Sequence, residues 1–192
     1  MITSYEDIHG WFDYKDLYSE FSSLLTDSKT FVEVGVWKGK SISFLATDLK
    51  QSNKKPTLFA IDTFKGTAGD PGHRGMIDSL QVSLLDHFKE NLKHLEIDDY
   101  VNIIKKDSVE ASEMFQNETI DIIFIDADHS YEAVKKDLEA WYPKVKRNGI
   151  IAGHDYLGDD WPGVKKAVDE FFVDKNTTVT ECPPSSWKAI KK

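Results

Sequence analysis

The sequence predicts an α/β domain with an open, doubly wound parallel sheet and helices on both of its faces. Three observations lead to this prediction. Short apolar runs alternate with helical stripes along the 192 residues, which is typical of a parallel sheet with crossover helices. The runs are almost continuously apolar, as expected of strands covered on both sides. Polar residues follow the ends of the runs. Because no internal repeat or low-complexity linker divides the chain, residues 1–192 are predicted to form one domain.

The predicted strands are short runs rich in β-branched or aromatic residues. The five strands of the parallel part are Thr30–Val36, Thr57–Phe64, Val101–Lys106, Ile120–Ala127 and Gly149–Gly153. Two further runs, Thr177–Glu181 and Ser186–Ile190, flank a pair of prolines. We expect them to form a hairpin-like pair at the edge of the sheet.

Helices are predicted where apolar residues recur at spacings of three and four. Such stripes cover residues 14–25, 84–95, 131–145 and 164–172, and a further helix begins near Ser41. Asp107 and Ser130 are placed to cap short or long helices that follow them. The segment Lys65–Ser79 contains four glycines and no apolar period. We interpret it as a flexible, lid-like binding loop, with a surface insertion as the alternative.

Composition excludes several classes of partner. The formal net charge of −9 disfavours a nucleic-acid backbone, and the mixed stretch Lys135–Arg147 is typical of the solvated face of a helix. Cys182 is the only cysteine, so no internal disulfide is expected. No signal peptide is recognisable, and no apolar run approaches the roughly 18 residues of a membrane helix. We expect a cytoplasmic protein with a small-molecule substrate. Trp11, Phe12 and Tyr14 are candidates for a homodimer surface.

The stretch from Phe31 to Ser41 combines a buried strand, a glycine turn and the start of a helix. Glu33 lies inside the apolar strand, and a buried carboxylate needs a partner. We expect that partner to be the charged tail of a small cofactor over Gly35 and Gly39. The glycine spacing differs from that of dinucleotide and triphosphate sites, and an acid repels phosphate. S-adenosylmethionine, which has an ammonium group and no phosphate, is the predicted ligand; a simple tight turn is the alternative.

Acidic residues also end the next two predicted strands. The Asp62 carboxylate can accept two hydrogen bonds from a ribose diol. Asp107 and Ser108 follow the third strand, and we expect them at the edge of the adenine. Capping of a turn or helix is the alternative for Asp62 and Asp107, and the two roles are compatible at Asp107.

The densest chemistry follows the fourth and fifth strands. Asp126, Asp128 and His129 leave the fourth, and His154 and Asp155 leave the fifth. Adjacent strand ends bring these groups together, and carboxylate oxygens suit Mg²⁺. Asp126 and Asp155 are the first candidates as ligands. His154 or His129 would be a further ligand or a general base. The alternative is a metal-free site in which the acids make structural or substrate hydrogen bonds.

Four segments in this order resemble class I S-adenosylmethionine-dependent methyltransferases. They are residues 33–39, Ile61-Asp62, residues 124–131 and residues 148–155. Within that superfamily they are most similar to small O-methyltransferases of the macrocin and cephalosporin-tailoring type, relatives of the catechol enzymes. The resemblance implies a Rossmann-like sheet of seven strands whose last strand is antiparallel.

The resemblance also assigns roles to residues. It implies cofactor contacts at Glu33, Gly35, Gly39, Ser41, Asp62, Asp107 and Ser108, to which we add their neighbours Lys38 and Thr63 and the strand-end residue Asp126. It implies Mg²⁺ ligands at Asp126 and Asp155. The catechol enzymes have an asparagine ligand where this chain has Tyr156, so His154 or Asp128 would have to complete the metal site.

These residues predict transfer of a methyl group to a hydroxyl of a small molecule or sugar, with Mg²⁺ as a candidate assistant. Asp126 would act at the reacting centre, and His129 or His154 would receive the hydroxyl proton. Two other classes of function remain open at this stage. One is a non-catalytic domain that binds S-adenosylmethionine or a nucleoside, and the other is a nicotinamide-dependent oxidoreductase.

Overall fold

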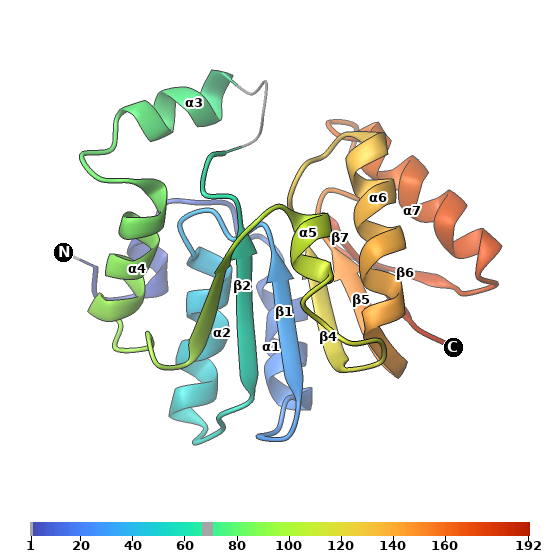
Figure 1. Cartoon of the computed structure of the whole chain (residues 1–192), viewed down its shortest axis with the longest axis horizontal. Coiled ribbons are helices and arrows are strands. Elements are labelled where there is room, and N and C mark those ends of the chain that lie inside the picture. The colour runs from blue at the N-terminus through green and yellow to red at the C-terminus, as the bar shows by residue number, and fades with distance from the viewer. Residues whose placement is uncertain (1, 67–70) are drawn as a thin grey trace.

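Seven strands form one sheet in the computed structural model, which describes residues 2–66 and 71–192 and no side chain between residues 67 and 74. The sheet order is β3-β2-β1-β4-β5-β7-β6 (Figure 1). The strands are β1 Thr30–Val34, β2 Thr57–Asp62, β3 Val101–Lys105, β4 Ile120–Ile125, β5 Val145–Gly153, β6 Val179–Cys182 and β7 Ser186–Ile190. All pairings are parallel except those of β7, which runs antiparallel to β5 and β6. The predicted sheet, including its antiparallel last strand and its terminal pair, is confirmed.

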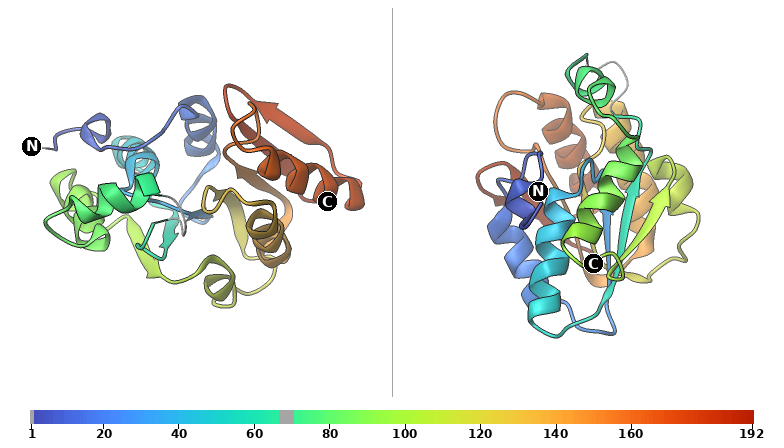
Figure 2. Two further views of the ribbon diagram at one scale, coloured as in Figure 1. Left: turned by 90° about the horizontal axis from the view of Figure 1, so that it is seen from above. Right: turned by 90° about the vertical axis from the view of Figure 1, so that its left-hand side faces the viewer.

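Helices cover both faces of this sheet, as predicted. The helices are α1 Lys15–Leu24, α2 Lys40–Gln51, α3 Pro71–Asp78, α4 Leu84–His94, α5 Ser108–Ser112, α6 Tyr131–Trp141 and α7 Pro162–Asp174, with short 3₁₀ turns η1 Tyr5–Asp7 and η2 Tyr142–Lys144. Buried residues of α1, α2 and α4 pack in one core cluster, and those of α6 and α7 pack in a second. Successive residues of β1 alternate between the two clusters, since Phe31 belongs to the first and Val32 to the second. The sheet therefore separates two helical layers, which the rotated views also show (Figure 2).

Two predicted helix caps are present. The Asp107 carboxylate accepts a hydrogen bond from the Val109 N–H at 3.0 Å, at the start of α5. The Ser130 hydroxyl accepts one from the Ala133 N–H at 3.4 Å, at the start of α6. Both side chains satisfy N–H groups that a helix leaves unpaired at its first turn. Helices α5 and α6 thus begin within a few residues of the ends of β3 and β4. The side chains in these short connections therefore lie at the carboxyl ends of the strands.

The segment between β2 and α4 differs from the prediction. We expected Lys65–Ser79 to lack regular structure, but α3 occupies Pro71–Asp78. Proline suits the first turn of a helix because its missing N–H would be unpaired there anyway. Part of the predicted lid, residues 67–70, lies outside the described residues. Helix α3 stands beyond the carboxyl ends of the strands (Figure 1), so the lid role stays a prediction.

Gly35 begins the turn that follows β1, and its backbone lies directly against the end of β4. Its φ is +84°, and a Cβ added there would lie 1.9 Å from the Asp126 carbonyl oxygen. The Gly35 N–H donates to the Ile61 carbonyl, and the Asp126 N–H donates to the Val34 carbonyl, both at 2.8 Å. Strand order reverses at β1, between β2 and β4, and ligands bind outside such switch points in open α/β sheets. A residue without a side chain is therefore required where the two halves of the sheet meet.

We expect Gly35→Ala to lower the free energy of unfolding by more than about 2 kcal/mol, because it adds a backbone clash to the strain of a left-handed conformation. Gly158→Ala is the matched control, since Gly158 also has a positive φ of +104° but has no atom within 4 Å of an added Cβ. Urea unfolding of both variants measures the difference. Equal losses in the two variants would contradict a role for the close approach to Asp126.

Candidate active site

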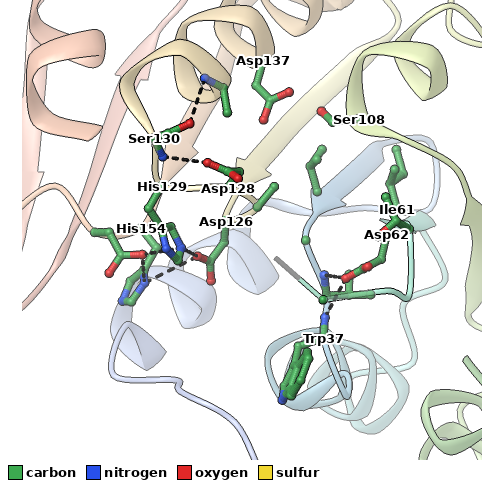
Figure 3. Close-up of a pocket in the computed structure, with 18 of the residues that line it drawn as sticks. Trp37, Ile61, Asp62, Ser108, Asp126, Asp128, His129, Ser130, Asp137 and His154 are labelled. Atoms are coloured by element: carbon green, nitrogen blue, oxygen red, sulfur yellow. Dashed lines mark hydrogen bonds and ion pairs between the residues drawn. The ribbon is translucent and has the colours of Figure 1, made fainter. Parts of the chain in front are cut away.

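A cavity of about 1010 Å³ opens at the carboxyl edge of the sheet, at the switch point. This volume is at the upper end of the roughly 300–1,000 Å³ typical of ligand sites. Most of the predicted site residues line it: Gly35, Ser41, Asp62, Thr63, Asp107, Ser108, Asp126, Asp128, His129, His154 and Asp155. Three predicted cofactor residues, Glu33, Lys38 and Gly39, are not among the lining residues. The close-up shows the acid and histidine groups after β4 and β5 facing the turn after β1 across this cavity (Figure 3).

Glu33 has a partner within the protein. Its side chain is 1% exposed, and its Oε1 accepts a short hydrogen bond from the Ser41 hydroxyl of α2. Its Oε2 has no hydrogen-bond partner among the described residues. Burial raises the pKa of Glu33 to about 8, against the lowering effect of the Ser41 and Tyr18 hydroxyls. Burial thus favours the protonated form of Glu33, Ser41 is one partner of its carboxyl group, and the predicted contact with a ligand ammonium stays a prediction.

Gly39 and Lys38 are explained by packing. Gly39 precedes α2 with a φ of +87°, and an added Cβ would lie 2.6 Å from the Phe88 ring of α4. Lys38 is 7% exposed, its carbonyl accepts a hydrogen bond from the Asn91 amide at 2.9 Å, and its ammonium lies 5.5 Å from the Trp37 ring. Both residues hold α2 close to α4. Their predicted contacts with a cofactor stay predictions.

Asp62 organises the turn after β1. Its Oδ2 accepts hydrogen bonds from the Val36 and Trp37 N–H groups, both at 3.0 Å, and its Oδ1 accepts one from the Phe64 N–H at 2.6 Å (Figure 3). The capping role that we held as an alternative is therefore present. The carboxylate also lines the cavity, so a ribose contact remains available to it as a proposal.

The ends of β3 and α6 form another wall of the cavity. The Ser108 hydroxyl accepts a hydrogen bond from the Trp141 Nε1 at 2.9 Å. Asp137 of α6 lies beside Ser108 (Figure 3), is 5% exposed and lines the cavity. Burial raises the pKa of Asp137 to about 6, although the Ser108 hydroxyl opposes the shift. Our interpretation of this stretch as a solvated helix face was wrong for Asp137, because charge counting along a helix does not reveal which side faces a cavity.

The strand ends after β4 and β5 form a cluster of two carboxylates and two imidazoles. His129 Nε2 lies 3.0 Å from Asp155 Oδ2 and 3.7 Å from Asp126 Oδ1. His154 Nδ1 lies 3.1 Å from Asp155 Oδ2 and 3.6 Å from Asp126 Oδ1. The Tyr14 hydroxyl, just before α1, donates to Asp126 Oδ2 at 3.2 Å. The predicted juxtaposition of the two strand ends is thus present.

Charge is balanced within this cluster. Burial would lower the histidine pKa values, but the two carboxylates outweigh it and raise the pKa of His129 to about 10 and that of His154 to about 11. Burial would raise the carboxyl pKa values, but hydrogen bonds from the two histidines hold the pKa of Asp126 and of Asp155 below its usual range. The two acids and the two imidazoles thus stabilise one another's charged forms.

Three of these side chains are arranged for a metal ion. One ligand atom each from Asp126, His154 and Asp155 lies within 4.8 Å of the others. Tyr156, at the position of the asparagine in catechol enzymes, points elsewhere: its hydroxyl donates to Asp169 at 2.5 Å and accepts from the Lys165 ammonium at 3.0 Å. Asp128 accepts a hydrogen bond from the Ser130 N–H at 2.8 Å. The donor set of two carboxylates and one imidazole fits a divalent cation.

Two tryptophans flank the mouth of the cavity and were not predicted as site residues. Trp161 precedes α7, is 43% exposed, and its ring lies 4.5 Å from the His129 ring. Trp11 is 58% exposed and lines the cavity. Tyr14 is 3% exposed, and Phe12 packs against Tyr18 at 5.4 Å. Two of the three aromatics that we assigned to a homodimer surface therefore belong to the core, and the homodimer stays a prediction.

Comparison with known proteins assigns the family. Residues 32–156 match a family model described as a methyltransferase domain, and the chain belongs to this family. The predicted resemblance to class I S-adenosylmethionine-dependent methyltransferases is confirmed. Within the described residues, no helix combines the length and apolarity that crossing a bilayer would need.

Individual solved structures and relatives support the assignment of the fold. The O-methyltransferase NovP has a TM-score of 0.71 and 21% identity, over 94% of this chain and 78% of its own. A Streptococcus mutans methyltransferase in complex with SAH, SMU.1697c, has a TM-score of 0.66 and 14% identity, over 96% and 100%. The uncharacterized protein R132 of Acanthamoeba polyphaga mimivirus is 30% identical over 77% of this chain. The chain spans 61% of that relative's length and 13% of the length of protein y4gI of Sinorhizobium fredii, which is 23% identical over 66% of this chain.

The raised pKa of Glu33 predicts a pH dependence of stability. In the unfolded chain Glu33 ionises near its ordinary pKa, whereas the folded protein keeps it protonated up to about pH 8. The folded state therefore binds more protons between about pH 5 and pH 8, and this residue makes stability fall as pH rises. Glu33→Gln removes the effect, so its stability relative to the parent should rise by on the order of 1 kcal/mol per pH unit in this window.

Urea unfolding of the parent and of Glu33→Gln at pH 5, 6, 7 and 8 measures this difference. A difference that stays constant across the four pH values would show that Glu33 is ionised in the folded protein.

Proposed function

We propose that this chain transfers the methyl group of S-adenosylmethionine to a hydroxyl oxygen of a small molecule or sugar, assisted by a divalent cation. The observation that supports this proposal best is that one cavity holds both halves of such a site. The turn after β1 and the Asp62 carboxylate line one side, and the Asp126–His154–Asp155 group lines the other. The similarity in fold to NovP, which is an O-methyltransferase, is consistent with a hydroxyl acceptor.

The cofactor would lie over the turn after β1. Asp62 holds that turn by two backbone hydrogen bonds, and its carboxylate lines the cavity where the ribose diol would lie. Ser108 and Asp137 would face the adenine edge, where an exocyclic amino group donates hydrogen bonds and a buried carboxylate accepts them. Gly35 would allow the donor to approach the backbone closely. Methyl transfer is an in-line displacement, so this alignment of donor and acceptor is the main task of these residues.

The acceptor would lie between the cluster and the two tryptophans. Asp126, His154 and Asp155 would hold a divalent cation, for which Mg²⁺ is the ion expected from the sequence. When bound, such a cation supplies positive charge that lowers the pKa of an acceptor hydroxyl. Trp161 and Trp11 would exclude water and cover an apolar face of the acceptor.

His129 is the residue we assign to proton acceptance. His154 belongs to the three residues that would hold the cation, Asp126, His154 and Asp155, which we call the cation group. His129 lies beside this group, 3.0 Å from Asp155, and its ring contacts Trp161 at the mouth of the cavity. The paired carboxylates keep the proton on His129 in the structure, with a pKa of about 10. Only a neutral imidazole can accept a proton, so His129 would first have to lose the one it holds, which a cation on those carboxylate oxygens would favour by lowering the pKa of His129. This assignment therefore requires that Asp126 and Asp155 take part in cation binding.

Calorimetric titration with S-adenosylhomocysteine, with and without Mg²⁺, tests the cofactor. We expect micromolar binding, and no binding of NADH. Asp62→Asn should weaken binding by about 10- to 100-fold, because it removes charge from a carboxylate that holds the turn. Asp121→Asn is the matched control: Asp121 also accepts a backbone N–H, from Thr30 at 2.9 Å, but at the opposite edge of the sheet. Failure of the parent to bind S-adenosylhomocysteine under either condition would overturn the proposed function.

Asp126→Asn tests the reaction. The amide keeps the side-chain volume and removes the charge, so the variant should stay folded and bind S-adenosylhomocysteine within about threefold of the parent while losing at least about 100-fold in turnover. Turnover is measured as S-adenosylhomocysteine formed with a panel of phenols and sugars. Undiminished turnover would exclude the role of Asp126, and binding without turnover on any hydroxyl acceptor would favour a non-catalytic binding domain.

A further inference from the structure

The cation group after β4 and β5 has a nitrogen donor, His154, between two carboxylates. We propose that His154, oriented by Asp13, makes this site select a divalent first-row transition ion over Mg²⁺. The inference rests on the proposed function only in placing the ion beside the acceptor. Mg²⁺ prefers oxygen ligands, whereas imidazole suits ions such as Zn²⁺, Fe²⁺ and Ni²⁺.

The orientation of His154 supports this choice. Its Nδ1 faces Asp126 and Asp155, and its Nε2 lies 2.9 Å from Asp13 Oδ1. A metal-binding histidine usually donates its other ring N–H to a carboxylate, which fixes the ring orientation. Asp13 provides that carboxylate from the segment before α1. An ion bound between Asp126 and Asp155 would displace the Nδ1 proton of His154 and take up the lone pair that this leaves.

Asp13 is itself held in place. The Ser185 hydroxyl, between β6 and β7, donates to Asp13 Oδ1 at 2.8 Å. The His154 ring also lies 4.7 Å from the Tyr14 ring, which packs on its side. Two segments that are far apart in the sequence, residues 13–14 and Ser185, therefore fix this imidazole, and Asp13 is a positioning residue for it.

Other oxygen donors near the group are engaged elsewhere. The Tyr156 hydroxyl is bound to Asp169 and Lys165 of α7. Asp128 accepts the Ser130 N–H at the start of α6. Within the part of the chain that the structure describes, Asp126, His154 and Asp155 are the group that meets the spacing for a metal. The third donor of the site is thus an imidazole.

Ion titrations with Zn²⁺ and Mg²⁺, followed by calorimetry, test the proposal. Most sites that contain nitrogen and oxygen donors bind Zn²⁺ more tightly than Mg²⁺. The ratio of the two affinities in the parent protein therefore does not by itself test the role of His154. We expect His154→Asp, which restores an all-oxygen site, to lower the ratio of Zn²⁺ to Mg²⁺ affinity by at least about tenfold. Asp128→Asn is the control and should leave the ratio unchanged, because that carboxylate accepts the Ser130 N–H in the turn before α6.

Asp13→Asn separates positioning from a structural role. It should weaken Zn²⁺ binding by about 10- to 100-fold in the parent and have no effect on Zn²⁺ binding in the His154→Asp background, where no imidazole remains to be oriented. A merely structural role would weaken binding in both backgrounds. If His154→Asp alone does not fold, the double variant, in which the new aspartate has lost Asp13 as a negative neighbour, takes its place in the comparison of Zn²⁺ to Mg²⁺ ratios with the parent.

An unchanged affinity ratio in His154→Asp, or no binding of either ion to the parent, overturns this inference. S-adenosylhomocysteine is titrated into the same samples. Its binding together with an unchanged ion ratio leaves the proposed function in place and removes only the ion preference. If His154→Asp lowers the Zn²⁺ to Mg²⁺ ratio but the parent does not bind S-adenosylhomocysteine, the ion preference is supported and the proposed methyltransferase function is overturned.

Discussion

The contact between the turn after β1 and the backbone at the end of β4 determines the geometry of the whole site. Gly35 has a left-handed φ of +84°, and a side chain there would meet the Asp126 carbonyl at 1.9 Å. Asp126 leaves β4 at this contact and contributes its carboxylate to the cation group. The turn that would hold the methyl donor and the acid that would act on the acceptor are therefore joined through backbone atoms. Side-chain rearrangement cannot separate them without disrupting the pairing of β1 with β4.

The fold was largely predictable because strong patterns agree across the chain. Continuous apolar runs gave the five parallel strands, and the proline pair marked the terminal hairpin, which forms β6 and β7. The region around α3 was not predictable, because the segment contains four glycines and shows no helical spacing of apolar residues. Asp137 was misjudged for another reason: its helix alternates charges of both signs, and only the tertiary structure shows that this aspartate faces the cavity rather than water.

The site was predictable where it follows the ends of parallel strands. Asp62, Ser108, Asp126 and Asp155 were all expected at one edge, since parallel strands place their carboxyl ends together, and all four line the cavity. The partners of Glu33 and His154 were not predictable. Ser41 reaches Glu33 from the second residue of α2, and Asp13 reaches His154 across 141 positions in the sequence. Contacts of that kind depend on how α1 and α2 dock on the sheet, which a local pattern does not encode.

The two halves of the site also differ in where their residues come from. The family match covers residues 32–156, which include the turn after β1, Asp62, Ser108 and the cation group. Trp11, Asp13 and Tyr14 precede that region, and Trp161 and Ser185 follow it. These five residues surround or support the side of the cavity where the acceptor would bind. Under the proposed function, the choice of acceptor would therefore depend in part on segments outside the residues that match the family. Replacing Trp161 with alanine should change which acceptors are used while leaving S-adenosylhomocysteine binding intact, because its ring lies 4.5 Å from the His129 ring, on the side of the cavity that carries the cation group.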